Sequence, residues 1–149
     1  MGGVETRWRV RQVFNVVNLS TLAGLLIGLA GRARFEKGKD GLVLARGWRL
    51  PAHASAVTIG NVVLLRLDDA ALAARPTLLT HEARHASQYA CCVGLPMLPL
   101  YVLAAIWSWL RCRDFSSYNV FEVRAGLADG GYRDARERGR TGPSGPEVA

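Results

Sequence analysis

The chain has 149 residues, 50% of them hydrophobic, and it carries a formal net charge of +7. This length is sufficient for one domain with a modest core. The three cysteines do not indicate a disulfide framework, because an odd number leaves at least one unpaired, and the lack of C-x-x-C spacing argues against a cysteine-rich zinc site.

Positive charge is concentrated beside apolar stretches. The basic residues around the first such stretch are Arg7, Arg9, Arg11, Arg32, Arg34, Lys37 and Lys39. A membrane surface or plain solvation explains this distribution better than a nucleic-acid groove does. Nucleic acid is therefore not an expected partner.

The first apolar segment, residues 12–31, contains no charged residue. Twenty helical residues span about 30 Å, the thickness of a bilayer core. Three interpretations stay open: a transmembrane helix, an uncleaved signal-like segment and a buried helix of the domain. Polar side chains inside the segment, such as Asn15 and Asn18, weaken the transmembrane interpretation.

A small antiparallel sheet is predicted next. Residues 32–40 are charged and predict a connector, whereas 41–48 and 56–65 are rich in leucine and β-branched residues. Gly60-Asn61, in the middle of the second run, predicts either a tight hairpin turn or a bulge. The alternative is that 56–65 forms one long strand paired with 41–48.

A helix is predicted over residues 76–93, with Pro76 in its first turn and Gly94 just after its end. One stripe of this helix carries two histidines. Small residues lie roughly opposite, at Ala83, Ala86, Ser87 and Ala90. We therefore expect the helix to be buried on two sides.

This helix contains the sequence HEARH, which satisfies H-E-x-x-H. His81 and His85 are at i and i+4, so both can present an imidazole nitrogen to one metal ion. Glu82 can reach a water on that metal without being a ligand. These residue types at this spacing favour a zinc hydrolase site. A pair of surface histidines is the competing interpretation, and the apolar and small neighbours disfavour it.

A second apolar segment, residues 95–110, ends in an aromatic and basic cluster. Pro96 and Pro99 lie near its start, and Trp107 and Trp109 lie near its end, before Arg111 and Arg113. This order is typical of a membrane interface, although a core helix with surface tryptophans fits as well. The prolines leave only about a dozen helical residues, which is short for a complete span.

A third metal ligand is expected on the last predicted helix, residues 120–129. Glu122 is the one downstream acid within an apolar helical pattern, whereas His53 could approach only by an accident of the fold. Asn119-x-x-Glu122 is also a capping box, in which the carboxylate would turn back to the helix start. We expect Glu122 to be a ligand, because zinc otherwise lacks a third one. Asp129 either orients a ligand histidine or is a solvated acid at the helix end.

The HEARH helix followed by the glutamate helix NVFEVRA resembles the gluzincin branch of the zinc metallopeptidases. The short chain is similar to the minigluzincins, and the apolar excursion between the two helices is similar to the membrane-associated gluzincins. The resemblance covers about residues 41–131 and is specific only in the motif. It implies that His81, His85 and Glu122 bind Zn²⁺ and that Glu82 is the general base. It also implies that an edge strand within 56–65, near Asn61, binds the substrate backbone.

Two features depart from the pattern of that family. Arg84 is charged at a motif position that is usually uncharged, and we expect it to pair with an acid or to bind an anionic substrate group. A transition-state stabiliser is not evident. Tyr118, Tyr132 and His53 are candidates by residue type only.

These observations predict an α+β fold with a zincin-like domain over residues 32–132, made of a short antiparallel sheet, an active-site helix, a glutamate helix and apolar helices. Residues 1–31 would form an apolar helical segment that could anchor the protein to a membrane. Residues 133–149 are charged and then rich in glycine, proline and serine, which predicts a disordered tail.

The expected function is zinc-dependent hydrolysis of peptide bonds in a peptide or protein substrate. Glu82 would act as general base on a zinc-activated water. The alternative is a non-enzymatic, membrane-associated protein that binds a metal. The expected location is the membrane surface, or otherwise the cytoplasm, and no feature of the sequence indicates an oligomeric state.

Overall fold

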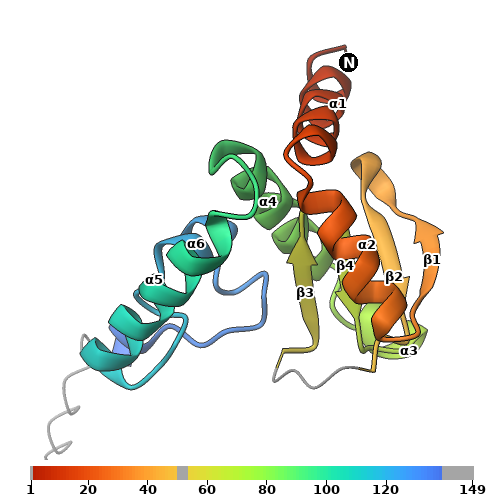
Figure 1. Cartoon of the computed structure of the whole chain (residues 1–149). Coiled ribbons are helices and arrows are strands. Elements are labelled where there is room, and N and C mark those ends of the chain that lie inside the picture. The colour runs from red at the N-terminus through yellow and green to blue at the C-terminus, as the bar shows by residue number, and fades with distance from the viewer. Residues whose placement is uncertain (1, 50–53, 139–149) are drawn as a thin grey trace, which may run out of the picture.

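The computed structural model describes residues 2–49 and 54–138. It confirms the predicted α+β class, with helices on both faces of a four-stranded sheet (Figure 1). The elements in chain order are α1 Gly2–Val17, α2 Ser20–Ala30, β1 Arg34–Lys37, a 3₁₀ turn at Lys39–Gly41, β2 Val43–Arg46, β3 Ala56–Ile59, β4 Val62–Leu65, α3 Asp69–Ala73, α4 Leu78–Cys91, α5 Met97–Cys112, α6 Val120–Ala125 and α7 Ala135–Arg138.

The sheet is mixed, with strand order β1-β2-β4-β3. β1–β2 and β3–β4 are antiparallel pairs, whereas β2 and β4 pair in parallel, which the sequence did not predict. The predicted hairpin at Gly60-Asn61 is confirmed, and Gly60 takes a φ of +62° that suits glycine in a tight turn. The hairpin brings β4 beside β2 and leaves β3 as an edge strand.

The connector expected at residues 32–40 is partly wrong, because it contains β1. All four side chains of β1 are exposed, so the strand has no alternation of apolar and polar residues that would reveal it. Its pairing with β2, in a register that places Arg34 opposite Arg46, defines it instead.

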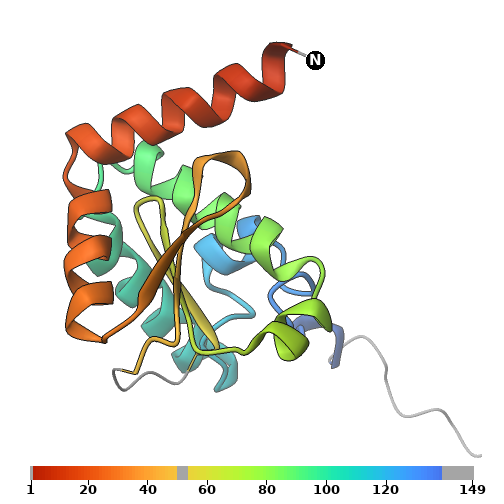
Figure 2. The same ribbon diagram turned by 90° about the vertical axis from the view of Figure 1, so that its right-hand side faces the viewer.

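Alternate side chains of the central strands point to opposite faces of the sheet, as the pleat requires. Leu44, Val63 and Leu65 pack with residues of α3 and α4, whereas Ala45, Val62 and Leu64 pack with residues of α2. Figure 2 shows the sheet between α2 and α4. The core therefore has two layers, and α4 lies against the sheet along its length.

The N-terminal apolar segment is two helices rather than one. The chain breaks at Asn18 and Leu19, where Leu19 has a φ of 64° and the Asn18 side chain accepts a hydrogen bond from the Ser20 N–H at 3.1 Å. Within the described residues, none of the helices is by itself long and apolar enough to cross a membrane, although the pair Glu5–Val17 and Ser20–Ala30, bent by 74°, meets that criterion jointly. The predicted boundary between an N-terminal segment ending at residue 31 and a domain beginning at residue 32 stays a prediction.

A buried polar cluster joins these helices to the rest of the fold. Asn15 donates to the Asn61 side chain at 3.0 Å and to the Ala86 carbonyl at 2.8 Å, and Asn61 donates to Thr21 Oγ1 at 3.0 Å. Asn61 is therefore a structural residue at the hairpin turn. Its side chain points to α1 and α2, and the expectation that it lies near a bound substrate stays a prediction.

The later helices differ from their predicted limits. α4 begins at Leu78, so Pro76 precedes the helix. α6 ends at Ala125, short of the predicted Asp129, because Gly126 leaves the helix with a φ of +91°. Of the tail predicted to be disordered, residues 135–138 form α7, and residues 139–149 lie outside the described residues.

Replacement of Gly24 by alanine should destabilise the fold. A Cβ at this position would lie 2.5 Å from the Ile59 carbonyl oxygen and 2.8 Å from Val62 Cβ, and both atoms belong to the sheet. The expected loss is about 1–3 kcal/mol in the free energy of unfolding, as for other overpacked sites. Urea unfolding followed by circular dichroism would measure it.

Gly28→Ala is the matched control, because the substitution and the helix are the same. A Cβ there meets the end of the exposed Phe35 ring at 2.8 Å, which can rotate away. The gain in helix propensity, up to about 1 kcal/mol, then offsets the contact. Equal stability of the two variants would contradict the close packing of α2 on the sheet.

Candidate metal centre

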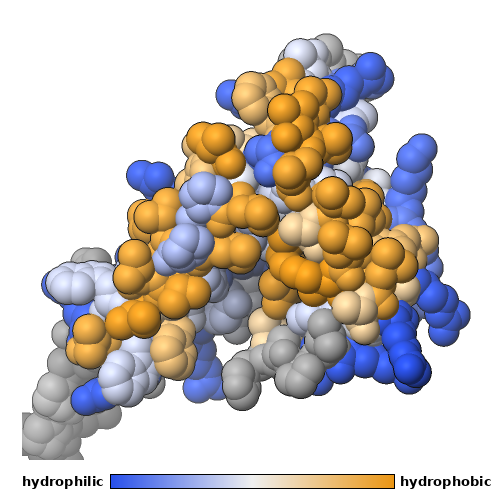
Figure 3. Space-filling model, in the orientation of Figure 1, coloured by the Kyte–Doolittle hydropathy of each residue, from blue (hydrophilic) through white to orange (hydrophobic). Residues whose placement is uncertain are grey.

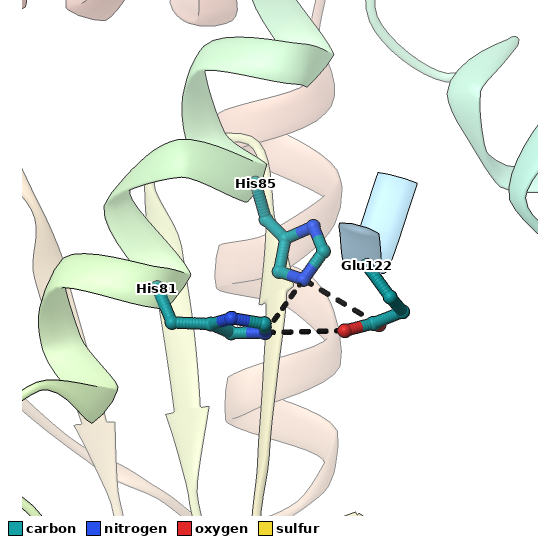
Figure 4. Close-up of side chains that lie close together, drawn as sticks. All are labelled: His81, His85 and Glu122. Atoms are coloured by element: carbon teal, nitrogen blue, oxygen red, sulfur yellow. Dashed lines mark hydrogen bonds and ion pairs between the residues drawn. The ribbon is translucent and has the colours of Figure 1, made fainter. Parts of the chain in front are cut away.

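Two histidines and one glutamate converge in a buried position between α4 and α6 (Figure 4). The exposed fractions of His81, His85 and Glu122 are 1%, 7% and 2%. The two Nε2 atoms are 3.0 Å apart, His81 Nε2 is 3.2 Å from Glu122 Oε2, and His85 Nε2 is 3.5 Å from Glu122 Oε1. One ligand atom from each residue lies within 4.8 Å of the others, so this group could hold a metal ion.

The outer nitrogens of both imidazoles have hydrogen-bond acceptors. His81 Nδ1 lies 2.9 Å from the Gly126 carbonyl oxygen, and His85 Nδ1 lies 2.9 Å from Gln88 Oε1. Gln88 in turn donates its amide to the Phe121 carbonyl at 2.9 Å, which sets the orientation of that side chain. Each neutral imidazole therefore carries its proton on Nδ1.

The positions of the imidazole protons indicate whether these residues fit a metal ion. With both protons on Nδ1, the two Nε2 lone pairs point toward each other across 3.0 Å. Lone pairs at this distance repel unless a cation or a proton lies between them. Glu122 Oε2 is also buried without a hydrogen-bond partner. Nitrogen lone pairs and a free carboxylate oxygen directed at one point are the donor set that a divalent metal ion requires.

The start of α6 shows whether Glu122 acts as part of a helix cap. Asn119 does cap α6, since its side chain accepts a hydrogen bond from the Phe121 N–H at 3.0 Å. The reciprocal bond of a capping box is not made, because the Asn119 N–H donates to the Ser116 carbonyl. The Glu122 carboxylate instead faces the histidines, where a ligand would lie.

The electrostatics keep Glu122 ionised. Burial raises the pKa of this carboxyl, but the adjacent imidazoles of His81 and His85, together with the Tyr101 hydroxyl, outweigh that effect and lower the pKa to about 2. Burial lowers the pKa of His85, and the adjacent Glu122 more than compensates, so the net shift is upward. The cluster thus concentrates negative charge at a point that favours a cation.

Glu82 lies on the same helix and lines a cavity of about 250 Å³ with His85, Tyr101 and Glu122. Its carboxylate accepts a hydrogen bond from the Thr58 hydroxyl of β3 at 2.6 Å. Burial raises the pKa of Glu82, and this hydrogen bond opposes the shift only in part. A carboxylate with a raised pKa can take up and release a proton more readily at neutral pH.

Tyr101 and Thr58 are site residues that sequence reasoning missed. The Tyr101 hydroxyl of α5 donates to Glu122 Oε1, and the Tyr101 ring lines the cavity. Its only signal in the sequence is a phenol within the otherwise apolar segment 95–110. The comparable signal for Thr58 is a hydroxyl within the otherwise apolar start of the run 56–65. In the structure this residue is buried in β3.

The candidate stabilising residues have different positions. Tyr132 lines the cavity, with its ring centroid 5.9 Å from that of His81. Tyr118 lies instead against the guanidinium of Arg111, 4.7 Å from it. His53 lies outside the described residues. Among the described residues, Tyr132 is therefore the candidate that the fold brings to the site.

Arg84 was expected either to pair with an acid or to bind an anionic substrate group, and the structure shows that it pairs with an acid. Its Nη1 lies 2.5 Å from Asp129 Oδ2 and 2.6 Å from the Ala125 carbonyl oxygen. Asp129 therefore orients an arginine and not a ligand histidine, and the Gly126 carbonyl orients His81 instead. These contacts join α4 to the end of α6.

Comparison with known proteins adds no family assignment: no protein family, no curated protein and no solved structure matches this chain.

Gln88→Leu should weaken the binding of a divalent metal ion. The change removes the acceptor that keeps the His85 proton on Nδ1, while the leucine side chain is of similar size. Loss of such a supporting hydrogen bond typically weakens metal affinity by about 10–100-fold. Titration with Co²⁺ or Zn²⁺ against a chelating dye would measure the affinity.

Ser87→Ala is the control on the neighbouring residue, whose exposed hydroxyl donates only to the Ala83 carbonyl. It should bind the ion as wild type does. Wild-type affinity in Gln88→Leu would show that Gln88 does not support the ligand.

Proposed function

We propose that this protein is a zinc-dependent peptidase. One observation carries the proposal: two members of the buried cluster, His85 and Glu122, line the same cavity as a second acidic residue, Glu82. Three protein donors beside a cavity are typical of a catalytic zinc site, whereas structural sites use four.

The donor set supports zinc among the divalent metals. Two imidazoles and one carboxylate are borderline donors that suit zinc well. Four donors arranged tetrahedrally at about 2.0–2.1 Å from a zinc ion are about 3.3 Å from one another. The two Nε2 atoms, 3.0 Å apart, and His81 Nε2 with Glu122 Oε2, 3.2 Å apart, have separations close to that value.

In the proposed reaction, Glu82 moves the protons. A zinc ion held by the cluster supplies Lewis-acid chemistry, which acidifies water and polarises a carbonyl. Glu82 accepts the proton of the attacking water and later delivers it to the leaving amine. Thr58 holds the carboxylate in place at 2.6 Å. Tyr132 also lines the cavity, where its hydroxyl could stabilise a developing oxyanion.

A peptide substrate is supported by the wall formed by β3. This strand is at the end of the sheet, and Ala56, Val57 and Thr58 line the cavity. An extended peptide can pair with the backbone of such an edge strand. The remaining wall includes Met97 and Leu98 of α5, which favours apolar side chains next to the cleaved bond.

Purified protein should contain one zinc ion per chain, and His81→Ala should lose it. The reason is that removal of one imidazole leaves two protein donors, too few for a stable site. Mass spectrometry of the metal content would measure the stoichiometry. Ser87→Ala, on the exposed side of the same helix, is the control and should retain zinc. Wild-type protein without zinc, even after incubation with it, would refute the proposal.

Glu82→Gln should retain zinc and lose peptide hydrolysis by about 10²–10⁴-fold, the usual contribution of a general base. The amide keeps the Thr58 hydrogen bond but cannot accept the proton. Digestion of a peptide library prepared from a cell proteome, with the cleavage products identified by mass spectrometry, would measure the activity.

Two outcomes of this experiment would oppose the proposal in different ways. Undiminished cleavage by Glu82→Gln would exclude Glu82 as the base. No cleavage by zinc-loaded wild type would favour the non-enzymatic alternative, in which the bound metal has a structural or regulatory role.

A further inference from the structure

Exposed apolar side chains gather on the outer sides of α1, α2 and α5. Large examples are Phe14, Leu22, Leu26, Leu103, Trp107 and Leu110, all at least 49% exposed. Figure 3 shows hydrophobic residues over these three helices, with hydrophilic residues mainly at the edges of the same view. We call this surface the apolar face. A contiguous exposed apolar surface of this kind commonly marks an interaction site.

The exposure does not reflect loose packing of the helices. The inner side of α2 is close to the sheet, since a Cβ on Gly24 would clash with the Ile59 carbonyl oxygen and Val62 Cβ. The inner side of α5 buries Met97 and Ser108. α2 is therefore packed closely on the sheet, and both helices present apolar residues outward, so this surface fits a partner.

The distribution of charge indicates which partner. Residues 12–31 and 86–110, which carry most of the apolar face, contain no charged residue. Basic residues follow both segments, at Arg32 and Arg111. The guanidinium of Arg113 lies 4.1 Å from the ring centroid of Trp109. Apolar helices bounded by arginines and tryptophans match the depth profile of a membrane interface, with hydrocarbon beneath and anionic headgroups around it.

We propose that the apolar face docks on an anionic membrane surface, with α2 and α5 lying in the interfacial plane. A second copy of the chain is a poorer occupant, because each copy carries a net charge of +7 and arginines at the borders of the face. These charges repel between copies and attract anionic lipids. The proposal does not depend on the metal centre or on hydrolysis.

Flotation with lipid vesicles tests the docking. Purified full-length protein is mixed with vesicles of phosphatidylcholine, or of phosphatidylcholine with 30% phosphatidylglycerol. The expected result is flotation with the anionic vesicles, at least tenfold stronger than with the neutral ones, and weaker as salt rises. Protein that floats with neither vesicle would overturn the proposal.

A pair of charge-matched variants locates the contact. Leu26→Glu with Leu103→Glu places two acids on the apolar face, at residues that are 57% and 63% exposed. Ala70→Glu with Ala73→Glu places two acids on exposed positions of α3, outside that face. The first variant should lose vesicle binding at least tenfold, and the second should bind nearly as wild type does. Equal binding by the two variants would overturn the proposal.

Two further measurements guard against misfolding and self-association. Brominated lipids should quench the tryptophan fluorescence of the wild type, and Trp107→Phe should lose part of that quenching. Unquenched fluorescence would contradict the docking. Light scattering without lipid reports the oligomeric state. The wild type could prove to be a dimer that binds no vesicles and that the double variant Leu26→Glu with Leu103→Glu dissociates. That result would assign the face to a second copy and overturn the proposal.

Discussion

The burial of the Glu122 carboxylate is the constraint around which this half of the molecule is arranged. An ionised carboxylate removed from water is costly unless other groups replace its hydration. Here Tyr101 donates a hydrogen bond to one oxygen, and the imidazoles of His81 and His85 lie within 3.5 Å of the carboxylate. These partners come from α4 and α5, while Glu122 itself comes from α6. One buried charge therefore requires three helices to converge at one point.

Further polar contacts hold α4 and α6 in that arrangement. His81 reaches the Gly126 carbonyl, Gln88 reaches the Phe121 carbonyl, and Arg84 reaches Asp129. The last pair is partly exposed, and such pairs contribute only about 0–1 kcal/mol, so its main effect is on position. Each contact links α4 to the segment around α6, and together they set the angles of the imidazoles.

The other half of the molecule meets a different constraint, because its helices have apolar residues on both sides. α2 covers one face of the sheet with small residues inward, and this close seating leaves leucines outward. The buried cluster of Asn15, Asn61 and Thr21 joins α1, α2 and the hairpin with directional bonds. Specific hydrogen bonds thus orient helices that apolar packing alone would leave free to rotate.

The sequence by itself determined the features that depend on neighbouring residues. The i and i+4 spacing placed His81 and His85 on one side of a helix, Gly60-Asn61 indicated a hairpin turn or a bulge, and Asn119 indicated a helix start. Glu122 was identifiable because it is an acid within an apolar helical pattern. These inferences succeed because the helix period and the turn geometry are local.

Only the tertiary structure decided the features that join distant segments. The parallel pairing of β2 with β4, the strand β1 and the 74° bend between α1 and α2 all depend on what each segment packs against. In the site, Thr58 beside Glu82 and Tyr101 beside Glu122 are pairs separated by 24 and 21 residues. No local pattern encodes such contacts, because a side chain's neighbours across the fold are set by the packing of whole elements.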